Sequence, residues 1–386
     1  MAVLTHQVAL KIFQEALLIL SEWCGADVSH QLIDSGKTGE QAIIEAKKLV
    51  NWPSQATPSE AIGALKVVFD SIKLEQRQKA VHYWPAWAIK NTDNPRDSRK
   101  HYPQIPYPMT QEPDEAQINA LKGEAKDDLA KLTSDDWGQL SLLMLMLEKY
   151  GTYISFGEPD IAFFDQVKTT AAIAAALGKN PATEELCLVA GDLSGIQDFI
   201  YTISSDGALK SLRARSFTLE LVTEEIVQQL LTRLELPRSN VIYAGGGNLY
   251  LLAPAGEDIQ QKVSKIREGF NDWLLTEFQS KVFLSLTSCA FPKSDVGKKE
   301  FTVHWEAAIQ KLAVQKSRKF DRQITSLLAT RHAHEPCKVC HRDDTTDIKP
   351  WREDGVEACP TCREMLRLGQ KLFNVGALVR STVEDI

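Results

Sequence analysis

Four cysteines near the end of the sequence have the spacing of a metal site. They form two C-x-x-C pairs separated by 18 residues, namely Cys337, Cys340, Cys359 and Cys362. Each pair makes a tight turn that directs two thiolates to one point, and two such turns complete a tetrahedral sulfur cage. Because this cage leaves no coordination position open, the spacing predicts a structural Zn²⁺ site. The nearby His332, His334 and His341 are the alternative ligands that could replace one cysteine.

A second group of glycine and polar residues lies at two turns in the middle of the chain. In palm-type nucleotidyl transferases, acidic residues at two such turns hold the metal ions. Here only the first turn carries an acid, so we expect no two-metal chemistry from this site alone. Backbone amides at the start of the following helix could still receive a phosphate, whereas the alternative is that the glycines only satisfy turn geometry. The candidates for nucleotide contact are Asp192, Ser194, Gly195, Gln197, Gly246, Gly247 and Asn248.

The elements around these turns predict a β-α-β-β-α-β unit. Short apolar runs mark the first and last strands, and the triple glycine between two apolar runs is typical of a hairpin, because glycine allows positive φ angles. This order is the ferredoxin-like arrangement of palm and cyclase domains. The predicted strands are 185–191, 240–254 (as a hairpin) and 282–291. One predicted helix begins at 196, and two longer ones span 211–234 and 258–278.

The first 180 residues are predicted to form an all-helical domain. Apolar residues recur at helical spacing in several stretches, which are 3–23, 39–50, 58–72, 134–150 and 161–177. Residues 91–115 contain five prolines among polar residues and are expected to form an irregular connection. We therefore predict an α+β chain with three domains: helical (1–180), palm (181–300) and zinc-binding (301–386).

A basic segment precedes the cysteines. Residues 303–331 are predicted to be helical, and residues 364–373 form a last helix behind the zinc ribbon. The basic face is either a solvated surface or a contact for RNA or a neighbouring subunit. The residues that would make this contact are Lys316, Arg318 and Lys319.

Composition limits the class of protein. The formal net charge of −7 argues against an independent nucleic-acid binder but is compatible with a subunit of a nucleoprotein complex. No apolar run reaches the roughly 20 residues of a membrane span, and the first ten residues lack a secretory pattern. We therefore expect a cytoplasmic protein without a membrane partner. The remaining cysteines, Cys24, Cys187 and Cys289, are expected to be core residues.

Several ordered blocks resemble one known family. The segments GDLSGIQDFIY (191–201), LRARSFTLEL (212–221) and NVIYAGGGNLYLLAP (240–254) resemble the first palm domain of the large subunit of type III CRISPR effector complexes, the Cas ten family of Csm and Cmr assemblies. Residues 160–177 and 68–85 resemble parts of the N-terminal helical domain of that family. The zinc ribbon lies where the family has one, and the resemblance spans most of residues 60–375.

The resemblance implies three activities. Family members organise a complex with guide RNA, some cleave single-stranded DNA in an N-terminal HD-type domain, and many make cyclic oligoadenylates from ATP at a second palm with Gly-Gly-Asp-Asp. This chain has no His-Asp dipeptide, and Asp165-Gln166 stands where family members often have Asp-His. His6 and His82 are isolated. We therefore expect a degenerate HD-like domain without nuclease activity.

The chain also ends, at Ile386, where a second palm would begin, and it contains no Gly-Gly-Asp-Asp. We expect a split or truncated protein that is inactive alone. The first hypothesis is therefore a scaffold that binds guide CRISPR RNA, target RNA and other effector subunits, with ATP as a possible ligand. The alternatives are a cyclic oligoadenylate synthase, when joined to a second palm, and a zinc-ribbon adaptor unrelated to CRISPR.

Overall fold

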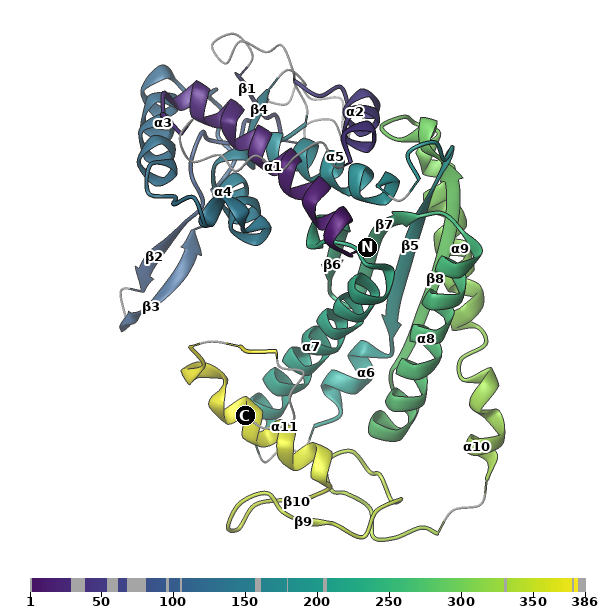
Figure 1. Ribbon diagram of the computed structural model, residues 1–386. Coiled ribbons are helices and arrows are strands. Elements are labelled where there is room, and N and C mark those ends of the chain that lie inside the picture. The colour runs from purple at the N-terminus through teal and green to yellow at the C-terminus, as the bar shows by residue number, and fades with distance from the viewer. Residues whose placement is uncertain are drawn as a thin grey trace.

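The chain folds into a helical part, a sheet with helices on both faces and a small cysteine-rich unit (Figure 1). This computed structural model describes residues 2–28, 39–53, 62–67, 81–94, 97–104, 106–156, 161–178, 180–203, 207–329, 332–376 and 378–380. The α+β class predicted from the sequence is confirmed.

The central sheet has the predicted ferredoxin-like topology. Its four strands are antiparallel and run in the order β6-β7-β5-β8. One helical connection joins β5 to β6 and another joins β7 to β8, so the β-α-β-β-α-β order is confirmed. The first connection contains two helices, as predicted from residue 196 onward and for residues 211–234. The elements are β5 (Glu185–Ser194), α6 (Ile196–Tyr201), α7 (Ala208–Leu234), β6 (Val241–Gly245), β7 (Asn248–Pro254), α8 (Glu257–Phe278) and β8 (Phe283–Pro292).

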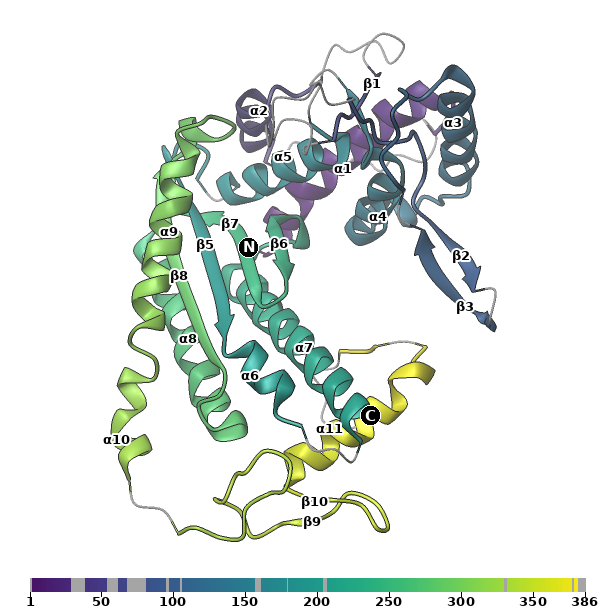
Figure 2. The same ribbon diagram turned by 180° about the vertical axis from the view of Figure 1, so that it is seen from behind.

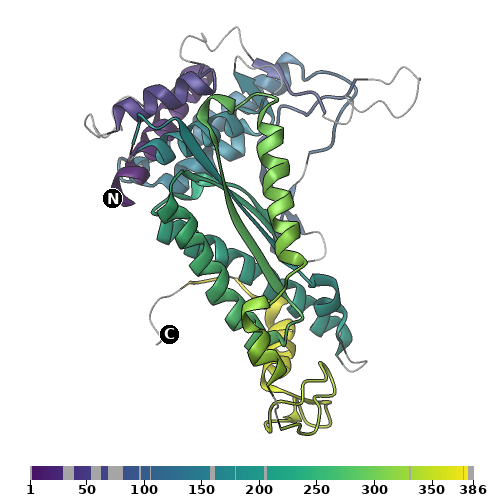
Figure 3. The same cartoon turned by 90° about the vertical axis from the view of Figure 1, so that its right-hand side faces the viewer.

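Both faces of this sheet are covered. Alternate residues of a strand point to opposite faces, and in β5 Leu188 and Ala190 join one core whereas Cys187 and Val189 join another. The second core lies under α7 and α8. The first lies under α5 (Phe163–Leu177) and α9 (Phe301–Lys316), so α9 and the pair α7 and α8 lie on opposite sides of the sheet (Figure 3). Burial on both faces explains why β5 is a continuous apolar run in the sequence.

The helical part packs on the same core as one face of the sheet. Helices α1 (Ala2–Cys24) and α5 contact each other extensively, and α5 also contacts β7. Fully buried aromatic side chains such as Phe13, Trp137 and Phe163 fill the space between the helices. The remaining helices of this part are α2 (Glu40–Leu49), α3 (Glu115–Leu129) and α4 (Leu140–Gly151).

The expectation of an all-helical first part is wrong. Strand β1 (Ile62–Ala64), within the predicted helix 58–72, pairs with β4 (Ile154–Phe156), while residues 58–61 and 68–72 lie outside the described residues. Strands β2 (Lys90–Asn94) and β3 (Asp97–Gln104) form a hairpin that projects from this part (Figure 1), where we expected an irregular connection. Its polar sequence has no apolar alternation, and an isolated hairpin tolerates proline at its edges, so the pattern was not visible.

The predicted basic helix 303–331 is also interrupted. Helix α9 ends at Lys316, and Phe320 adopts a positive φ of 55° before the short helix α10 (Ile324–Leu328); Arg331 lies outside the described residues. The Phe320 side chain is buried and packs edge-on against Phe283 of β8. This contact with the sheet overrides the helical propensity of the segment. In the described part of the chain no helix is both long and apolar enough to cross a lipid bilayer.

An ion cluster joins α3 to α4, and it allows a test of the pH dependence of stability. Burial would raise the pKa of Asp128, but hydrogen bonds from Lys131, Lys149 and Tyr150 outweigh it and hold this pKa well below its usual range. We expect Asp128→Asn to lower the free energy of unfolding by about 2 kcal/mol at pH 7, because hydrogen bonds to a charged group contribute about 1.5–3 kcal/mol.

The sign of the pH effect follows from the depressed pKa of Asp128. Its stabilising contribution is present above about pH 4, near the pKa of an unfolded aspartate, and is lost as the pH falls further. Urea denaturation of wild type and Asp128→Asn should therefore give curves that differ at pH 7 and converge below pH 4. A difference that is independent of pH would contradict this assignment. Asp258→Asn, which removes an exposed i,i+4 pair with Lys262, is the control.

Candidate metal centre and palm turn

The four predicted cysteines meet at one point below the sheet. Cys337 and Cys340 lie in a turn that ends the connection from α10. Cys359 and Cys362 lie at the start of α11 (Pro360–Lys371), just after the short strand pair β9 (Lys349–Pro350) and β10 (Glu357–Ala358) (Figure 2). All four sulfur atoms lie within 4.8 Å of one another. Three of these cysteines are buried and Cys340 is partly exposed.

The geometry of this cluster fits a tetrahedral thiolate cage. Zinc–sulfur bonds of about 2.3 Å place two ligand sulfurs about 3.8 Å apart, and the Sγ atoms of Cys340 and Cys359 are 3.7 Å apart. Backbone amides of Val339, Cys340 and Cys359 donate to Cys337 Sγ at 3.3–3.5 Å. The hydrogen bond from Cys340, together with those from the other two thiols, lowers the pKa of Cys337. The four side chains can therefore hold one metal ion.

The alternative histidine ligands are not part of this cluster. Among the described residues, the group that could hold a metal contains the four cysteines and no histidine. His332 and His334 instead stack on each other with ring centroids 6.2 Å apart. A four-cysteine donor set is therefore complete without them.

The predicted palm residues come together at the end of β5. Asp192 pairs in register with Asn248, and the backbone amide of Leu193 donates to the carbonyl of Gly247 at 2.8 Å. Ser194 Oγ donates to the carbonyl of Phe283 at 3.3 Å, so its hydroxyl is engaged within the sheet. Gln197 is exposed on α6, which is only six residues long. Contact of these residues with a nucleotide remains a prediction.

Two of the three candidate glycines are required by local geometry. Gly195 has φ +89°, and a Cβ there would lie 1.9 Å from the carbonyl oxygen of Lys281. Gly247 has φ +83°, and its Cβ would lie 2.3 Å from the Ile196 side chain. Gly246 also has a positive φ but has no atom within 4 Å of the added carbon. The turn-geometry interpretation therefore accounts for Gly195 and Gly247, whereas Gly246 lies at an open surface.

The single acid of the palm turn, Asp192, is already paired. Lys316, at the end of α9, places its Nζ 2.8 Å from a carboxylate oxygen of Asp192, whose side chain is only 18% exposed. From the sequence we expected Lys316 to contact RNA or a neighbouring subunit, and this pair was not predicted. The neighbouring Arg318 and Lys319 are exposed. A carboxylate that faces a lysine, with no second acid at the hairpin, is a poor ligand set for two cations.

This pair should be measurable. We expect a double-mutant cycle with Asp192→Asn and Lys316→Met to give a coupling energy of about 1 kcal/mol, since the lysine is partly exposed and solvent screens the pair. The measurement is urea denaturation of the four proteins. A coupling energy near zero would show that the pair does not form in solution. Cycles with the exposed Lys319 in place of Lys316 supply the control.

The residue expected to mark a lost nuclease site is a structural contact. Gln166 is 3% exposed, and its Nε2 donates to the carbonyls of Val50 and Asn51 at the end of α2. Burial raises the pKa of the adjacent Asp165 and lowers that of His6. Apart from the cysteine cluster, no group of metal-binding side chains occurs in the described residues. The amide thus ties α5 to α2.

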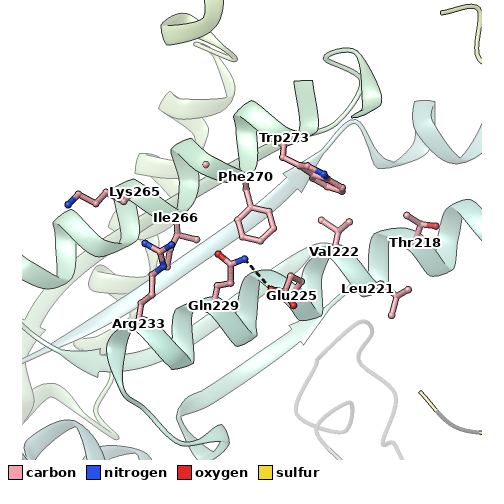
Figure 4. Close-up of a pocket in the computed structure, with 11 residues that line it drawn as sticks. Thr218, Leu221, Val222, Glu225, Gln229, Arg233, Lys265, Ile266, Phe270 and Trp273 are labelled. Atoms are coloured by element: carbon pink, nitrogen blue, oxygen red, sulfur yellow. Dashed lines mark hydrogen bonds between the residues drawn. The ribbon is translucent and has the colours of Figure 1, made fainter. Parts of the chain in front are cut away.

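An apolar groove on the outer side of α7 and α8 was not predicted. It has a volume of about 640 Å³ and its lining includes Leu221, Phe270 and Trp273, with Arg233 and Lys265 at one end (Figure 4). Trp273 and Leu221 are about 40% exposed although they lie on helices that cover a core. Apolar residues on the outward positions of both helices were the available signal in the sequence.

Comparison with known proteins agrees with the fold and the motifs. Residues 185–333 match the family described as Csm1 subunit domain B. The chain is 32% identical over 280 residues to the CRISPR system single-strand-specific deoxyribonuclease Cas10/Csm1 (subtype III-A) of Thermococcus onnurineus, covering 66% of this chain and 35% of that protein. It is 30% identical over 297 residues to the protein of the same name from Mycobacterium tuberculosis, covering 70% and 36%. The chain thus spans little more than a third of these relatives.

Solved structures show the same architecture. The crystal structure of Csm1 from T. onnurineus superposes with a TM-score of 0.54 and 28% identity, over 72% of this chain and 38% of that one. A Csm1–Csm4 cassette in complex with pppApApA gives a TM-score of 0.56 over 92% of this chain and 54% of that one, and its 21% identity shows the fold alone. With the ordered palm motifs and the cysteine cluster, these relationships show that the chain belongs to the Cas10/Csm1 family of type III CRISPR large subunits.

Proposed function

We propose that this chain is a scaffold part of the large subunit of a type III CRISPR effector complex and contributes to binding guide RNA and target RNA. The observation that carries this proposal is a palm sheet whose one turn carboxylate, Asp192, is paired with Lys316. The hairpin opposite offers Gly247 and Asn248 rather than a second acid. The fold is thus suited to hold neighbours in position, and the chain alone is not equipped for two-metal nucleotidyl transfer.

In this proposal the four cysteines hold a structural zinc ion. Sulfur atoms in a closed tetrahedral arrangement favour Zn²⁺, which would fix the fold of the ribbon without taking part in chemistry. We also propose that the palm turn contacts a nucleotide in the complete complex. Related Csm1–Csm4 structures contain one ATP or AMPPNP, and here Gly246 and the exposed Gln197 lie at the surface of that turn. The division into helical, palm and zinc-binding domains belongs to the same proposal.

The partner expected first is a Csm4-type subunit. Solved relatives are cassettes of Csm1 with Csm4, and a scaffold needs at least one such neighbour. The exposed Arg318 and Lys319 beyond α9 are the proposed contact with the RNA backbone or a neighbouring subunit, whereas Lys316 is occupied by Asp192. The buried contacts of Gln166 further favour a helical part without nuclease activity.

Co-expression tests this function. The tagged chain, produced with the Csm4-type subunit and a guide RNA, should retain both through size-exclusion chromatography. If Arg318 and Lys319 contact phosphates, their joint replacement by glutamine should weaken RNA retention and reduce the salt slope of binding by about one for each lost contact. The charge-matched control is Arg233→Gln with Lys265→Gln, in the groove between α7 and α8.

Two results would contradict the proposal. A wild-type chain that leaves the subunit and the RNA behind would exclude the scaffold role. Formation of cyclic oligoadenylates from ATP and magnesium by this chain alone would show that the palm is a complete catalyst. If the two glutamine double variants reduced RNA retention equally, Arg318 and Lys319 would not be the RNA contact, but the scaffold role would be unaffected.

A further inference from the structure

A buried arginine in the palm lies against the cysteine cluster. Arg215 of α7 is 2% exposed, yet among the described residues no carboxylate forms an ion pair with it. Glu277 lines the same small cavity as Arg215, and its Oε2 accepts a hydrogen bond from Thr361. A buried cation without an anionic partner is strongly unfavourable. The position of Arg215 therefore requires a negative charge that the carboxylates do not supply.

The cysteine cluster supplies that charge. One terminal nitrogen of Arg215 donates to Cys362 Sγ at 3.3 Å. Zn²⁺ bound by four thiolates has a net double negative charge, and hydrogen bonds to ligating sulfur stabilise it. The other terminal nitrogen donates to the carbonyl of Phe199 at 3.1 Å, and the guanidinium lies over the Phe199 ring. Arg215 thus connects the second cysteine pair to α6, the helix that follows the palm turn.

Lys281 makes a parallel connection from the first cysteine pair. Its Nζ donates to the carbonyl of Cys340 at 2.5 Å. Its own carbonyl oxygen packs against Gly195, so closely that no side chain fits there. The two cysteine pairs are therefore each tied, through one cationic side chain, to the segment that contains Gly195 and α6.

We propose that Arg215 and Lys281 are positioning residues that couple zinc occupancy of the ribbon to the order of the palm turn at residues 193–199. This inference rests on the proposed zinc site. With the thiolate centre in place, Arg215 has its counter-charge and holds Phe199, while Cys340 holds Lys281 against Gly195. Without the metal, nothing holds the four sulfur atoms at one point, so Arg215 and Lys281 lose the fixed positions of their partners Cys362 and Cys340, and the turn becomes less ordered.

The test compares Arg215→Met, Lys281→Met and the control Arg233→Met in the full chain. Arg233 lies on the same helix but is exposed and distant from the cysteines. Competition with a chromophoric chelator should show zinc affinity reduced 10–100-fold in Arg215→Met, as is usual for loss of an outer contact to a metal ligand. Arg215→Lys, which keeps the charge, should recover part of the affinity. In the Co²⁺-loaded protein, loss of the N–H donor should move the thiolate-to-metal charge-transfer band to lower energy.

Hydrogen exchange measures the coupling itself. In the wild type, removal of zinc should increase amide exchange at residues 193–199, which lie outside the cysteine pairs. In Arg215→Met and Lys281→Met this exchange should already be raised with zinc bound, and removal of zinc should change it less. Lys281→Met leaves Arg215 unchanged. If Arg215→Met does not fold, hydrogen exchange in Lys281→Met still tests the coupling.

Three outcomes would overturn the inference. In the first, the wild type binds zinc, and Arg215→Met and Lys281→Met have the same zinc affinity and the same amide exchange as Arg233→Met. In that case the proposed coupling is wrong, although the zinc site itself is present. If exchange at residues 193–199 does not respond to zinc removal, the turn is independent of the metal. If the wild type binds no zinc at all, the proposed zinc site fails, and the inference fails with it.

Discussion

Replacing Cys359 by serine is expected to abolish zinc binding and to unfold the ribbon, while the palm stays folded. Among the described residues, the cluster around the ligands contains two other buried apolar side chains, Val339 and Ala358. Burial of this small apolar area cannot offset the conformational entropy that is lost when the loops of the ribbon become ordered. The metal must therefore supply the folding free energy of the ribbon. Binding of structural zinc contributes roughly 10–16 kcal/mol in small zinc domains. Metal analysis should find about one zinc per wild-type chain and almost none in Cys359→Ser.

Limited proteolysis locates the effect. Cleavage should appear within residues 332–371 of Cys359→Ser, and of the wild type treated with a strong chelator, while the palm segment 207–292 stays protected. The matched control is Cys24→Ser, since Cys24 is also buried and its Sγ donates to the carbonyl of Ser21, a bond that serine can keep. Cys359→Ser protein that retained zinc and resisted cleavage would show that the ribbon is held by other contacts.

The palm topology could be predicted from sequence because its signals are local. The glycine-rich hairpin between β6 and β7 requires positive φ angles at Gly246 and Gly247, and each flanking strand is a short apolar run. The antiparallel order then leaves few arrangements for the two helical connections. The cysteine cluster was predictable for the same reason, since the spacing within and between the pairs already determines a four-sulfur cage.

Contacts between distant segments were not predictable in this way. Lys316 follows Asp192 by more than a hundred residues, and no periodicity indicates that the end of α9 lies against the end of β5. Gln166 looked like a lost metal ligand, whereas its role as a tie to α2 is visible only when Val50 and Asn51 are placed beside it. Arg215 lay within a family-like segment, but its contact with Cys362 depends on how α11 packs on α7.

The helical part was the least accurately predicted for a different reason. Its strands are short or polar, so they pair without the alternating apolar pattern by which strands are recognised. The hairpin of β2 and β3 has a register shift and contains Pro103 opposite Asn91. Here the hydrogen bonds between the two strands determine the structure, although the local amino-acid composition favours a loop. Such segments need the tertiary structure, because neither residue type nor spacing specifies a partner.

Substitution of Gly195 by alanine is expected to destabilise the palm far more than the same change at Gly246. Both glycines have positive φ angles, which cost about 1–2 kcal/mol for alanine. At Gly195 the new Cβ would also lie 1.9 Å from the carbonyl oxygen of Lys281, so the backbone before β8 must move. Adding about 1–3 kcal/mol for such overpacking gives a loss of about 3 kcal/mol or more.

Gly246→Ala isolates the backbone contribution, because nothing lies within 4 Å of its Cβ. Its free energy of unfolding should fall by only about 1 kcal/mol. Chemical denaturation followed by circular dichroism gives both values, and hydrogen exchange should show increased opening at residues 193–199 only in Gly195→Ala. Equal losses in the two variants would mean that Lys281 does not pack on the turn, and the proposed connection from the cysteine pairs to the palm would lose its contact point. A larger loss at Gly195, together with weaker zinc binding, would instead show that the turn and the metal centre stabilise each other across the same contact.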